Sequence, residues 1–519
     1  MIKLILLLFP IYAIAENVPP QTGFPFEIPS SSRIRAGTAN ITDIQGDAKP
    51  EIIIGDDKGV VYAYTSTGVE LWRFDTGNAA IDSKPAVADM DLNGTKEIVV
   101  SSGSTFTPGA VGVITVLNSD GSFKCRYTPQ PFSVSGALGV IGSPAIANLD
   151  SDPQLEFVFG DWGARINVLN HDCSVVWQSR LPQAVTGVPH PDNYDETVDG
   201  VYSNDTIWSS PAIADMNNDG QLDIIIGTDT HVDGTDLTID GGRILVINGS
   251  NGLLIMSKDI DEVIWSSPAI ADLDGDGSLD IIVGAGYCWQ APPCVPANVS
   301  HSVVNKIYAW NKDGQALTGW PYNLGNYAVV TSSPAIADID KDGNLEVVIN
   351  TFKVGSGPPN EGRITVINKN GTLKWQKTPN IPAGGGNFVH FAANTTSPLV
   401  ADVINDDDFE IILPGNFDLI VWDKNGNQLM PTTDAGDRFL TLFTIGSTPT
   451  LADLDNDGDY ELIATSSNLN FNPLPASIYA WDLTTSTTKY QPWKSFRSNS
   501  QNTGVLTLPD PIFKNSFEQ

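Results

Sequence analysis

The stretch Ser266–Gly284, SSPAIADLDGDGSLDIIVG, is the clearest copy of a unit that the chain repeats eight times. Each copy consists of a short apolar segment, an acidic loop of nine residues and a second apolar segment. A repeat spacing of roughly 46–67 residues is typical of propellers and solenoids. We therefore expect one continuous body rather than several domains. The acidic loops begin at Asp43, Asp89, Asn148, Asp215, Asp272, Asp338, Asp402 and Asp453.

Four strands can be located in each repeat, and the fifth copy shows them best. We expect them at Pro268–Ala271, Asp280–Val283, Lys306–Trp310 and Ala316–Trp320. The second strand is dense in Ile and Val, as expected for a strand buried on both faces. Turns such as Asn311–Gly314 indicate a hairpin between the third and fourth strands. No stretch has a helical period. The sequence predicts an all-β fold, an eight-bladed β-propeller of four-stranded antiparallel blades.

A propeller ring must be closed between its last and first blades. The segment Gly23–Phe26 (GFPF) resembles Gly319–Tyr322 (GWPY) of the fifth repeat, so the N-terminal segment 16–35 could lend an outer strand to the last blade. The C-terminal stretch Tyr490–Trp493 is the alternative, and the sequence leaves both open. The propeller is expected to span residues 36–505, with a tail at 506–519.

The first fifteen residues, MIKLILLLFPIYAIA, have the features of a secretory signal peptide. Lys3 supplies the positive start, Leu4–Ile14 the apolar run and Ala13–Ala15 a cleavage site. The run is short for a membrane span, and an uncleaved anchor is the alternative. We expect export to the periplasm, the medium or the cell surface, with no membrane span in the mature chain. Calcium is plentiful and thiols can oxidise in such compartments.

The four cysteines allow two disulfides. Cys288 and Cys294 could close a small loop, and Cys125 and Cys173 lie near the outer hairpins of adjacent repeats, where they could pair or remain free. No Cys/His spacing typical of structural zinc is present.

The formal net charge of −33 comes mainly from the acidic loops. Positions one, three, five and nine of the eight loops hold 27 of the 61 acidic residues, and the other 34 nearly balance the 28 Lys and Arg. Such a surface repels phosphate backbones, which excludes nucleic acid as a partner. Clustered carboxylates instead call for cations.

The loops have the donor pattern of a calcium site. Calcium takes six to eight oxygens, and oxygens at alternate positions of a tight loop can converge on one ion. The closing acid at position nine and the flanking strands distinguish the loops from an EF-hand. Asp and Asn also occur in turns because they cap the backbone. Recurrence at identical offsets favours metal, because closely packed carboxylates repel one another unless a divalent ion compensates.

Six loops carry a complete or nearly complete donor set, and we expect five or six structural calcium ions. The sets are Asp272, Asp274, Asp276 and Asp280; Asp338, Asp340, Asp342 and Glu346; Asp453, Asp455, Asp457 and Glu461; Asp215, Asn217, Asp219 and Asp223; Asp89, Asp91, Asn93 and Glu97; and Asn148, Asp150, Asp152 and Glu156, with Pro153 where glycine is expected.

Two loops look weaker. The first loop (Asp43, Gln45, Asp47 and Glu51) has Ala48 in place of glycine. In the seventh loop Ile404 occupies the second donor position, so Asp406–Asp408 could restore a site only in a shifted register.

Long insertions mark the face of the disk opposite the acidic loops, at 181–207, 228–241, 285–305, 352–362 and 381–395. Long loops on a rigid scaffold commonly carry function. One interpretation is a carbohydrate or small-ligand platform. The alternative is that the two tryptophans before the first strands of repeats four and five pack between blades and that the histidines are structural. The candidate residues are Tyr202, Trp208, Trp265, Tyr287, Trp289, His190, His231, His301 and His390.

The unit SPAIADxDxDGxxDIIxG resembles the FG-GAP repeats, also known as VCBS repeats, of secreted bacterial proteins and integrin α-subunit propellers. The resemblance covers about residues 36–505 and implies a propeller with calcium, but no particular activity.

Three functions remain open. The leading one is a secreted, non-enzymatic propeller that binds a carbohydrate or protein at a cell surface. An enzyme is the second, because some rhamnogalacturonan lyases are calcium-dependent eight-bladed propellers with similar acidic loops. A purely structural surface component is the third. The sequence contains no GxSxG, HExxH or phosphate-binding glycine loop, so no catalytic residue is nominated.

Overall fold

The computed structural model describes residues 20–29, 32–77, 79–103, 112–129, 139–161, 165–180, 207–231, 240–260, 262–286, 305–325, 327–329, 332–353, 362–379, 396–415, 418–430, 439, 441, 444–467 and 475–506. The predicted signal peptide at 1–15, Cys288, Cys294 and nearly all of the 506–519 tail lie outside these residues.

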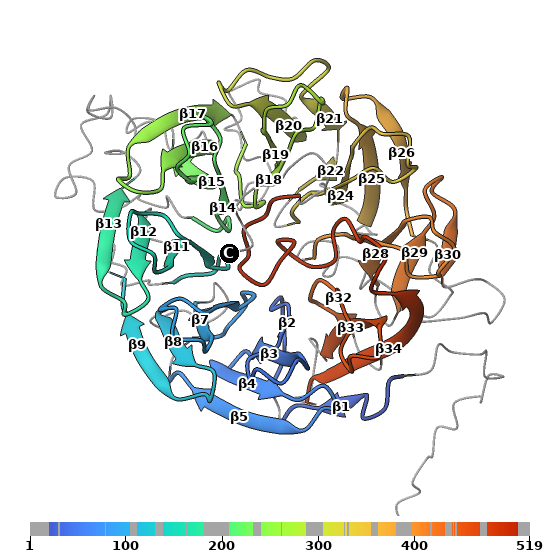
Figure 1. Ribbon diagram of the computed structural model, residues 1–519. Helices are drawn as coiled ribbons and strands as arrows, with labels where there is room; N and C mark the ends of the chain where they lie inside the picture. Colours follow the sequence, from blue (N-terminus) through green and yellow to red (C-terminus); the bar gives the residue numbers. More distant parts are fainter. Residues whose placement is uncertain are drawn as a thin grey trace, which may run out of the picture.

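The described residues form eight antiparallel sheets arranged around a central axis, which confirms the eight-bladed β-propeller (Figure 1). In seven blades the four strands run in chain order from the axis to the rim. In that part of the chain there is no helix long and apolar enough to cross a membrane.

The strands of blades 1 to 4 are β2 (Asn40–Thr42), β3 (Glu51–Gly55), β4 (Val60–Tyr64) and β5 (Glu70–Asp75); β6 (Ala86–Ala88), β7 (Glu97–Ser101), β8 (Ile114–Asn118) and β9 (Phe123–Tyr127); β10 (Ala145–Ala147), β11 (Glu156–Gly160), β12 (Arg165–Asn170) and β13 (Val175–Arg180); and β14 (Ala212–Ala214), β15 (Asp223–His231), β16 (Asp240–Asn248) and β17 (Leu254–Ile260).

Those of blades 5 to 8 are β18 (Ala269–Ala271), β19 (Asp280–Ala285), β20 (Asn305–Asn311) and β21 (Tyr322–Gly325); β23 (Ala335–Ala337), β24 (Glu346–Lys353), β25 (Gly362–Asn368) and β26 (Leu373–Lys377), with β22 (Tyr327–Ala328) beside β24; β27 (Leu399–Ala401), β28 (Glu410–Pro414), β29 (Leu419–Trp422) and β30 (Gln428–Met430); and β32 (Thr450–Ala452), β33 (Asp459–Ser467), β34 (Ser477–Ser486) and β1 (Phe26–Glu27), with β31 (Thr444–Ile445) beside β33.

The fourth strand of blade 5 was predicted in the wrong place. It is β21, and the predicted stretch Ala316–Trp320 is a turn that makes only an isolated bridge between Ala316 and Trp310. The chain turns here because Gly319 has a φ of 88° and the Trp320 amide donates back to the Leu317 carbonyl.

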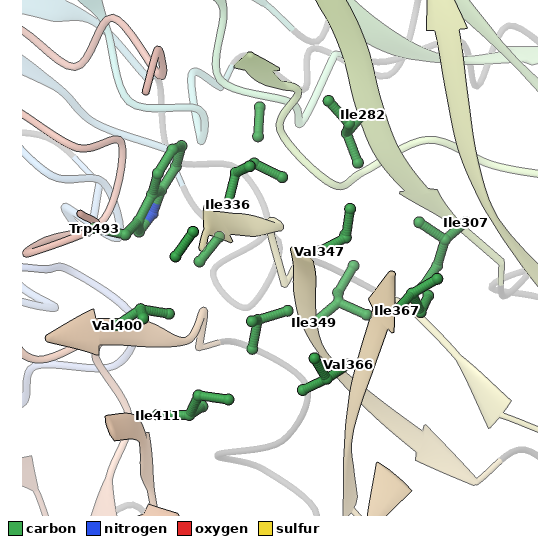
Figure 2. Close-up of a cluster of buried hydrophobic side chains, with 14 of the residues drawn as sticks. Ile282, Ile307, Ile336, Val347, Ile349, Val366, Ile367, Val400, Ile411 and Trp493 are labelled. Atoms are coloured by element: carbon green, nitrogen blue, oxygen red, sulfur yellow. The ribbon is translucent and has the colours of Figure 1, made fainter. Parts of the chain in front are cut away.

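The hydrophobic core lies between neighbouring blades. The second strands β3, β7 and β11 are buried along their whole length, as their Ile- and Val-rich sequences predict. Figure 2 shows the cluster that blades 5, 6 and 7 share, in which Ile336 and Val400 lie near Trp493. The C-terminal segment is therefore part of this core.

The residue before each opening proline, a serine in five blades, links one blade to the next. The amide of Ser143 donates to the Ser210 hydroxyl at 2.9 Å, and the same contact recurs from blade to blade. The result is a partial ring around the axis. Its bonds run from Lys84 to Ser143, Ser143 to Ser210, Ser210 to Ser267, Ser267 to Ser333, Ser333 to Ser397 and Ser397 to Thr448.

At the rim, a tryptophan of one blade packs on the hairpin turn of the next. Trp72 donates its indole N–H to the Ser119 carbonyl at 2.9 Å, and its ring leaves no room for a Cβ on Gly121. Trp177, Trp320 and Trp375 make the same bond to the following turn.

The junction between blades 2 and 3 uses a disulfide instead. Cys125 occupies the tryptophan position of β9 and pairs with Cys173, which holds the left-handed turn position with a φ of 66°. Of the two states that the sequence left open for these cysteines, the structure has the paired one.

The N-terminal segment closes the ring. Phe26 and Glu27 of β1 pair with Ile478 and Ser477 of β34, so the N-terminal alternative is correct. The C-terminal stretch instead turns inward, where Trp493 pairs with Val400 of β27.

The central channel is filled by residues Tyr490–Leu506, here called the channel segment (dark red in Figure 1). Six innermost strands donate their middle amide to a carbonyl of this segment at 2.8–3.1 Å. An innermost strand would otherwise expose an unpaired edge toward the axis, so the segment satisfies these amides. The donors are Val87, Ile146, Ile213, Ile270, Val400 and Leu451.

Three side chains anchor the channel segment to the starts of the innermost strands, two through proline carbonyls and one through a lysine that precedes an opening proline. Arg497, which is 1% exposed, donates to the Pro211 and Pro268 carbonyls. Asn502 donates to the Pro85 and Pro144 carbonyls. Lys84 donates to Ser495 Oγ and to the carbonyls of Phe496 and Asn499 at 2.9–3.1 Å.

Candidate metal centres

Each acidic loop joins the first strand of a blade to the second, and its closing acid stands at or near the start of the second strand. These acids are at most 2% exposed. One carboxylate oxygen of each accepts a hydrogen bond from the amide at loop position two. The pairs are Ile44–Glu51, Met90–Glu97, Leu149–Glu156, Met216–Asp223, Leu273–Asp280, Ile339–Glu346, Val403–Glu410 and Leu454–Glu461.

The residue at position one shapes the loop. Both oxygens of Asp215 accept backbone amides, from Asp219 at 3.1 Å and from Gly220 at 2.9 Å. Gly220 has a φ of 84°, so glycine at position six lets the chain turn. Ala48 adopts the same conformation in the first loop, with a φ of 70°. Its missing glycine therefore does not change the path of that loop.

In several of the described loops, three of the acidic side chains converge. One oxygen from each of three acids lies within 4.8 Å of the other two. Such groups include Asp89, Asp91 and Glu97; Asp150, Asp152 and Glu156; Asp272, Asp274 and Asp276; Asp338, Asp340 and Glu346; and Asp402, Asp406 and Glu410. These clusters could hold metal ions.

The expectation that the acids of the seventh loop could meet only in a shifted register is wrong. Asp406 meets Asp402 and Glu410 without any shift of register. Ile404 does not disturb this arrangement: it is 37% exposed, and the three carboxylate oxygens still lie within 4.8 Å of one another. The sequence pattern could have shown this, because an acid at loop position five can join the cluster whether or not position three holds an acid.

Four closing acids have a second carboxylate oxygen that is buried and unpartnered within the described part of the chain. One oxygen serves the loop amide, but the other lies where no donor reaches it. A buried, unsatisfied carboxylate oxygen costs several kcal/mol unless a cation compensates. These atoms mark the positions where a cation would be most stabilising. They are Glu156 Oε1, Asp223 Oδ1, Asp280 Oδ1 and Glu461 Oε1.

Burial raises the pKa of six closing acids and makes them hard to ionise. It raises the pKa of Glu156, Asp223, Asp280 and Glu346 to about 7, and neighbouring loop carboxylates add to the effect. The pKa of Glu410 and Glu461 rises to about 8 for the same reason. A bound cation would stabilise the charged form of each group.

Lysines touch the acids of three loops. Lys124 Nζ lies 2.6 Å from Asp91 Oδ2 and 2.8 Å from Glu97 Oε1. Lys374 pairs with Asp340 and lies 3.1 Å from Glu346 Oε1. In blade 7, Lys489 comes from the chain after β34 and contacts Asp402 and Asp407 at 3.1 and 2.8 Å. Sequence reasoning missed all three.

On the opposite face, the two tryptophans of the proposed ligand platform stack on each other. The ring centroids of Trp208 and Trp265 are 4.5 Å apart, and the planes differ by 13°. Trp265 is 5% exposed and Trp208 is half-buried, so the pair packs where blades 4 and 5 meet. His231 ends β15. The remaining candidates lie outside the described residues: Tyr202, Tyr287, Trp289, His190, His301 and His390.

No protein-family model matches the chain, and no curated protein is detectably similar to it in sequence. Its fold resembles that of solved propellers. The V. cholerae biofilm matrix protein Bap1 aligns with a TM-score of 0.58 and 12% identity over 95% of this chain and 96% of Bap1. A quinohemoprotein alcohol dehydrogenase of Pseudomonas putida HK5 gives 0.56 and 11%, over 90% and 77%. A europium-containing methanol dehydrogenase gives 0.55 and 11%, over 89% and 93%. At these identities the likeness concerns the fold alone.

Proposed function

We propose that this protein is a calcium-stabilised propeller of the FG-GAP/VCBS type that works outside the cytoplasm as a binding module. The observation that carries the calcium part is the set of four buried, unpartnered carboxylate oxygens at the ends of acidic loops. Each of these oxygens lies beside exposed carboxylates of the same loop. The loop therefore gathers negative charge that a bound cation would neutralise.

The donors favour a hard cation. The donor positions of the loops offer carboxylate and amide oxygens but no sulfur or imidazole, and calcium and magnesium prefer oxygen ligands. Calcium accepts more oxygens and a less regular geometry than magnesium does. A short loop with donors at four alternating positions suits calcium better.

Metal analysis tests this part of the proposal. The full chain is dialysed against buffer with and without calcium, and bound calcium is counted by mass spectrometry. We expect at least four calcium ions per chain and weaker binding of magnesium by calorimetry. A folded protein that retains no calcium would overturn the proposal.

The binding role rests on the division between the two faces. The acidic loops are short and self-contained, the channel is occupied by the protein's own C-terminal segment, and the sequence predicts the long insertions on the other face. A partner would therefore meet the insertion face. The predicted signal peptide and the resemblance in fold to a biofilm matrix protein are consistent with a surface role.

A glycan array tests the binding role. We expect a carbohydrate ligand whose affinity falls about tenfold in Trp208→Ala, because the half-buried Trp208 ring offers a stacking face. Trp265 is unsuitable for this test because it is buried. Unchanged binding in Trp208→Ala would remove Trp208 from the site, and an array without hits would favour the purely structural role.

The lyase alternative has its own assay. Pectic polysaccharide incubated with the protein and calcium should then give the ultraviolet absorbance of unsaturated uronate. The binding-module proposal expects no absorbance change.

A further inference from the structure

Two lysines lie where a metal ion is expected in the loops of blades 2 and 6. Lys124 Nζ bridges the carboxylates at loop positions three and nine, Asp91 and Glu97. Lys374 bridges the same two positions in blade 6, Asp340 and Glu346. Both ammonium groups are therefore placed between the two carboxylates that a loop-bound cation would join.

A shared irregularity of the outer hairpin puts the lysines there. In β9 the pairing with β8 passes from Cys125 to Phe123 and leaves Lys124 at a β-bulge. Lys374 occupies the same bulge between Trp375 and Leu373 of β26. A bulge redirects the side chain of its extra residue. Here it directs each lysine to the acidic loop of its own blade.

The other four blades with this bulge carry an apolar residue at the same position. These residues pack against the inter-blade core and cannot neutralise a carboxylate. They are Leu71, Val176, Ile255 and Leu429.

Blades 2 and 3 show what the lysine changes. Glu97 and Glu156 are both 0% exposed, and one oxygen of each accepts the loop amide. In blade 2 the second oxygen of Glu97 accepts from Lys124. In blade 3 the bulge residue is Val176, and the second oxygen of Glu156 has no partner among the described residues. The same buried acid is thus satisfied in one blade and unsatisfied in the next.

We propose that Lys124 and Lys374 replace the divalent ion in blades 2 and 6, so that these blades are independent of calcium while blades 3, 4, 5 and 8 require it. This inference rests on the proposed calcium binding. A tethered ammonium cannot be removed by chelation and competes with calcium at high effective concentration. The acidic loops of blades 2 and 6 would therefore stay neutralised when calcium is scarce.

Exchange of the bulge residues tests the proposal through the number of bound ions. In Lys124→Leu/Lys374→Leu, leucine is the residue that blades 1 and 7 already carry at the bulge. We expect this full-length variant, purified in calcium, to bind two more calcium ions than the wild type. The reciprocal change Val176→Lys places an ammonium beside Asp150 and Glu156, and we expect it to bind one ion fewer.

The outcomes separate the two proposals. Wild-type protein that binds no calcium overturns the proposed function and this inference with it. Wild-type protein that binds calcium while the lysine variants bind the same number overturns this inference alone. If the double leucine variant does not fold, Val176→Lys decides the matter, since an unchanged count would overturn the inference.

Discussion

The central channel and the acidic loops bury charge of opposite sign, and hydrogen bonds from the protein compensate the two charges to different extents. In the channel, Arg497 and Lys84 are nearly inaccessible, yet backbone carbonyls and a serine hydroxyl accept their N–H groups. In the loops, four equally buried acids keep an oxygen without a donor in the described structure. Within the described residues, the Lys84 ammonium and both terminal nitrogens of Arg497 find acceptors and only Arg497 Nε does not, whereas each of these acids keeps a carboxylate oxygen without a donor.

The difference follows from the hydrogen-bonding capacity of the backbone. A carbonyl oxygen has two lone pairs and can accept from a cation while it serves elsewhere, but an amide has only one hydrogen to donate. In each loop the position-two amide is used by one oxygen of the closing acid. Burial still has a cost in the channel, where it lowers the pKa of Lys84 to about 7, with nearby Arg497 and Lys494 adding to the effect. Within the described residues, the loops are where a cation from outside the chain would neutralise buried charge.

Removal of calcium is expected to have the largest effect on this comparison. When free calcium is at about 100 times the dissociation constant, a site present only in the folded state contributes about 2.7 kcal/mol to the free energy of unfolding. Four such sites contribute on the order of 10 kcal/mol. Differential scanning calorimetry with excess chelator should therefore show a much lower melting temperature than with calcium. A melting temperature that does not change would contradict the calcium assignment.

Loss of the disulfide changes the rim without changing any charge. Cys125 and Cys173 are 48 residues apart, and a cross-link of this span contributes about 4 kcal/mol in the loop-entropy account. Cys125→Ala should lower the denaturation midpoint but leave the number of bound calcium ions unchanged.

The matched variant Cys125→Trp/Cys173→Gly installs the residues that other blade junctions use. We expect it to recover part of the lost stability through packing of the indole on the turn glycine. Stability equal to that of Cys125→Ala would show that the junction rule does not transfer between blades.

Arg497→Met tests the channel half of the comparison. The substitution keeps much of the volume but leaves the Pro211 and Pro268 carbonyls without their charged donor. We expect a loss of about 2–4 kcal/mol in the free energy of unfolding. The loss should be the same with calcium and with chelator, because no acidic loop is touched. A calcium-dependent loss would mean that channel and loops are coupled.

The smallest expected change in stability distinguishes the acidic loop of blade 3 from that of blade 2. Glu156→Gln should lose one calcium ion and about 2–3 kcal/mol in calcium, yet melt higher than the wild type in chelator because a buried negative charge is gone. Glu97→Gln is the control: its partner is Lys124, so we expect an unchanged ion count and a similar loss in both buffers. If the stability of the two variants depended equally on calcium, the proposed difference between the two loops would be contradicted.

The fold and the position of the acidic loops were predictable because both depend on local sequence. Alternation of apolar strands, turn residues and carboxylates at fixed offsets acts within about sixty residues, and the eight blades follow from it. The Cys125–Cys173 pairing and the N-terminal closing strand were left open, since each joins segments that only the ring brings together. The place of the fourth strand in blade 5 was wrong because the turn at Gly319 was read as strand.

The sequence alone therefore determined the repeat, the blade and the oxygen-rich loops, all of which are set by neighbours along the chain. Only the tertiary structure decided which loops already hold a cation, that Asp406 completes the seventh cluster, and that residues 490–506 fill the channel. The physical reason is distance along the chain. Lys124 reaches its acids through a bulge in an outer hairpin, and Arg497 reaches a proline carbonyl 286 residues away, so neither contact leaves a local pattern to read.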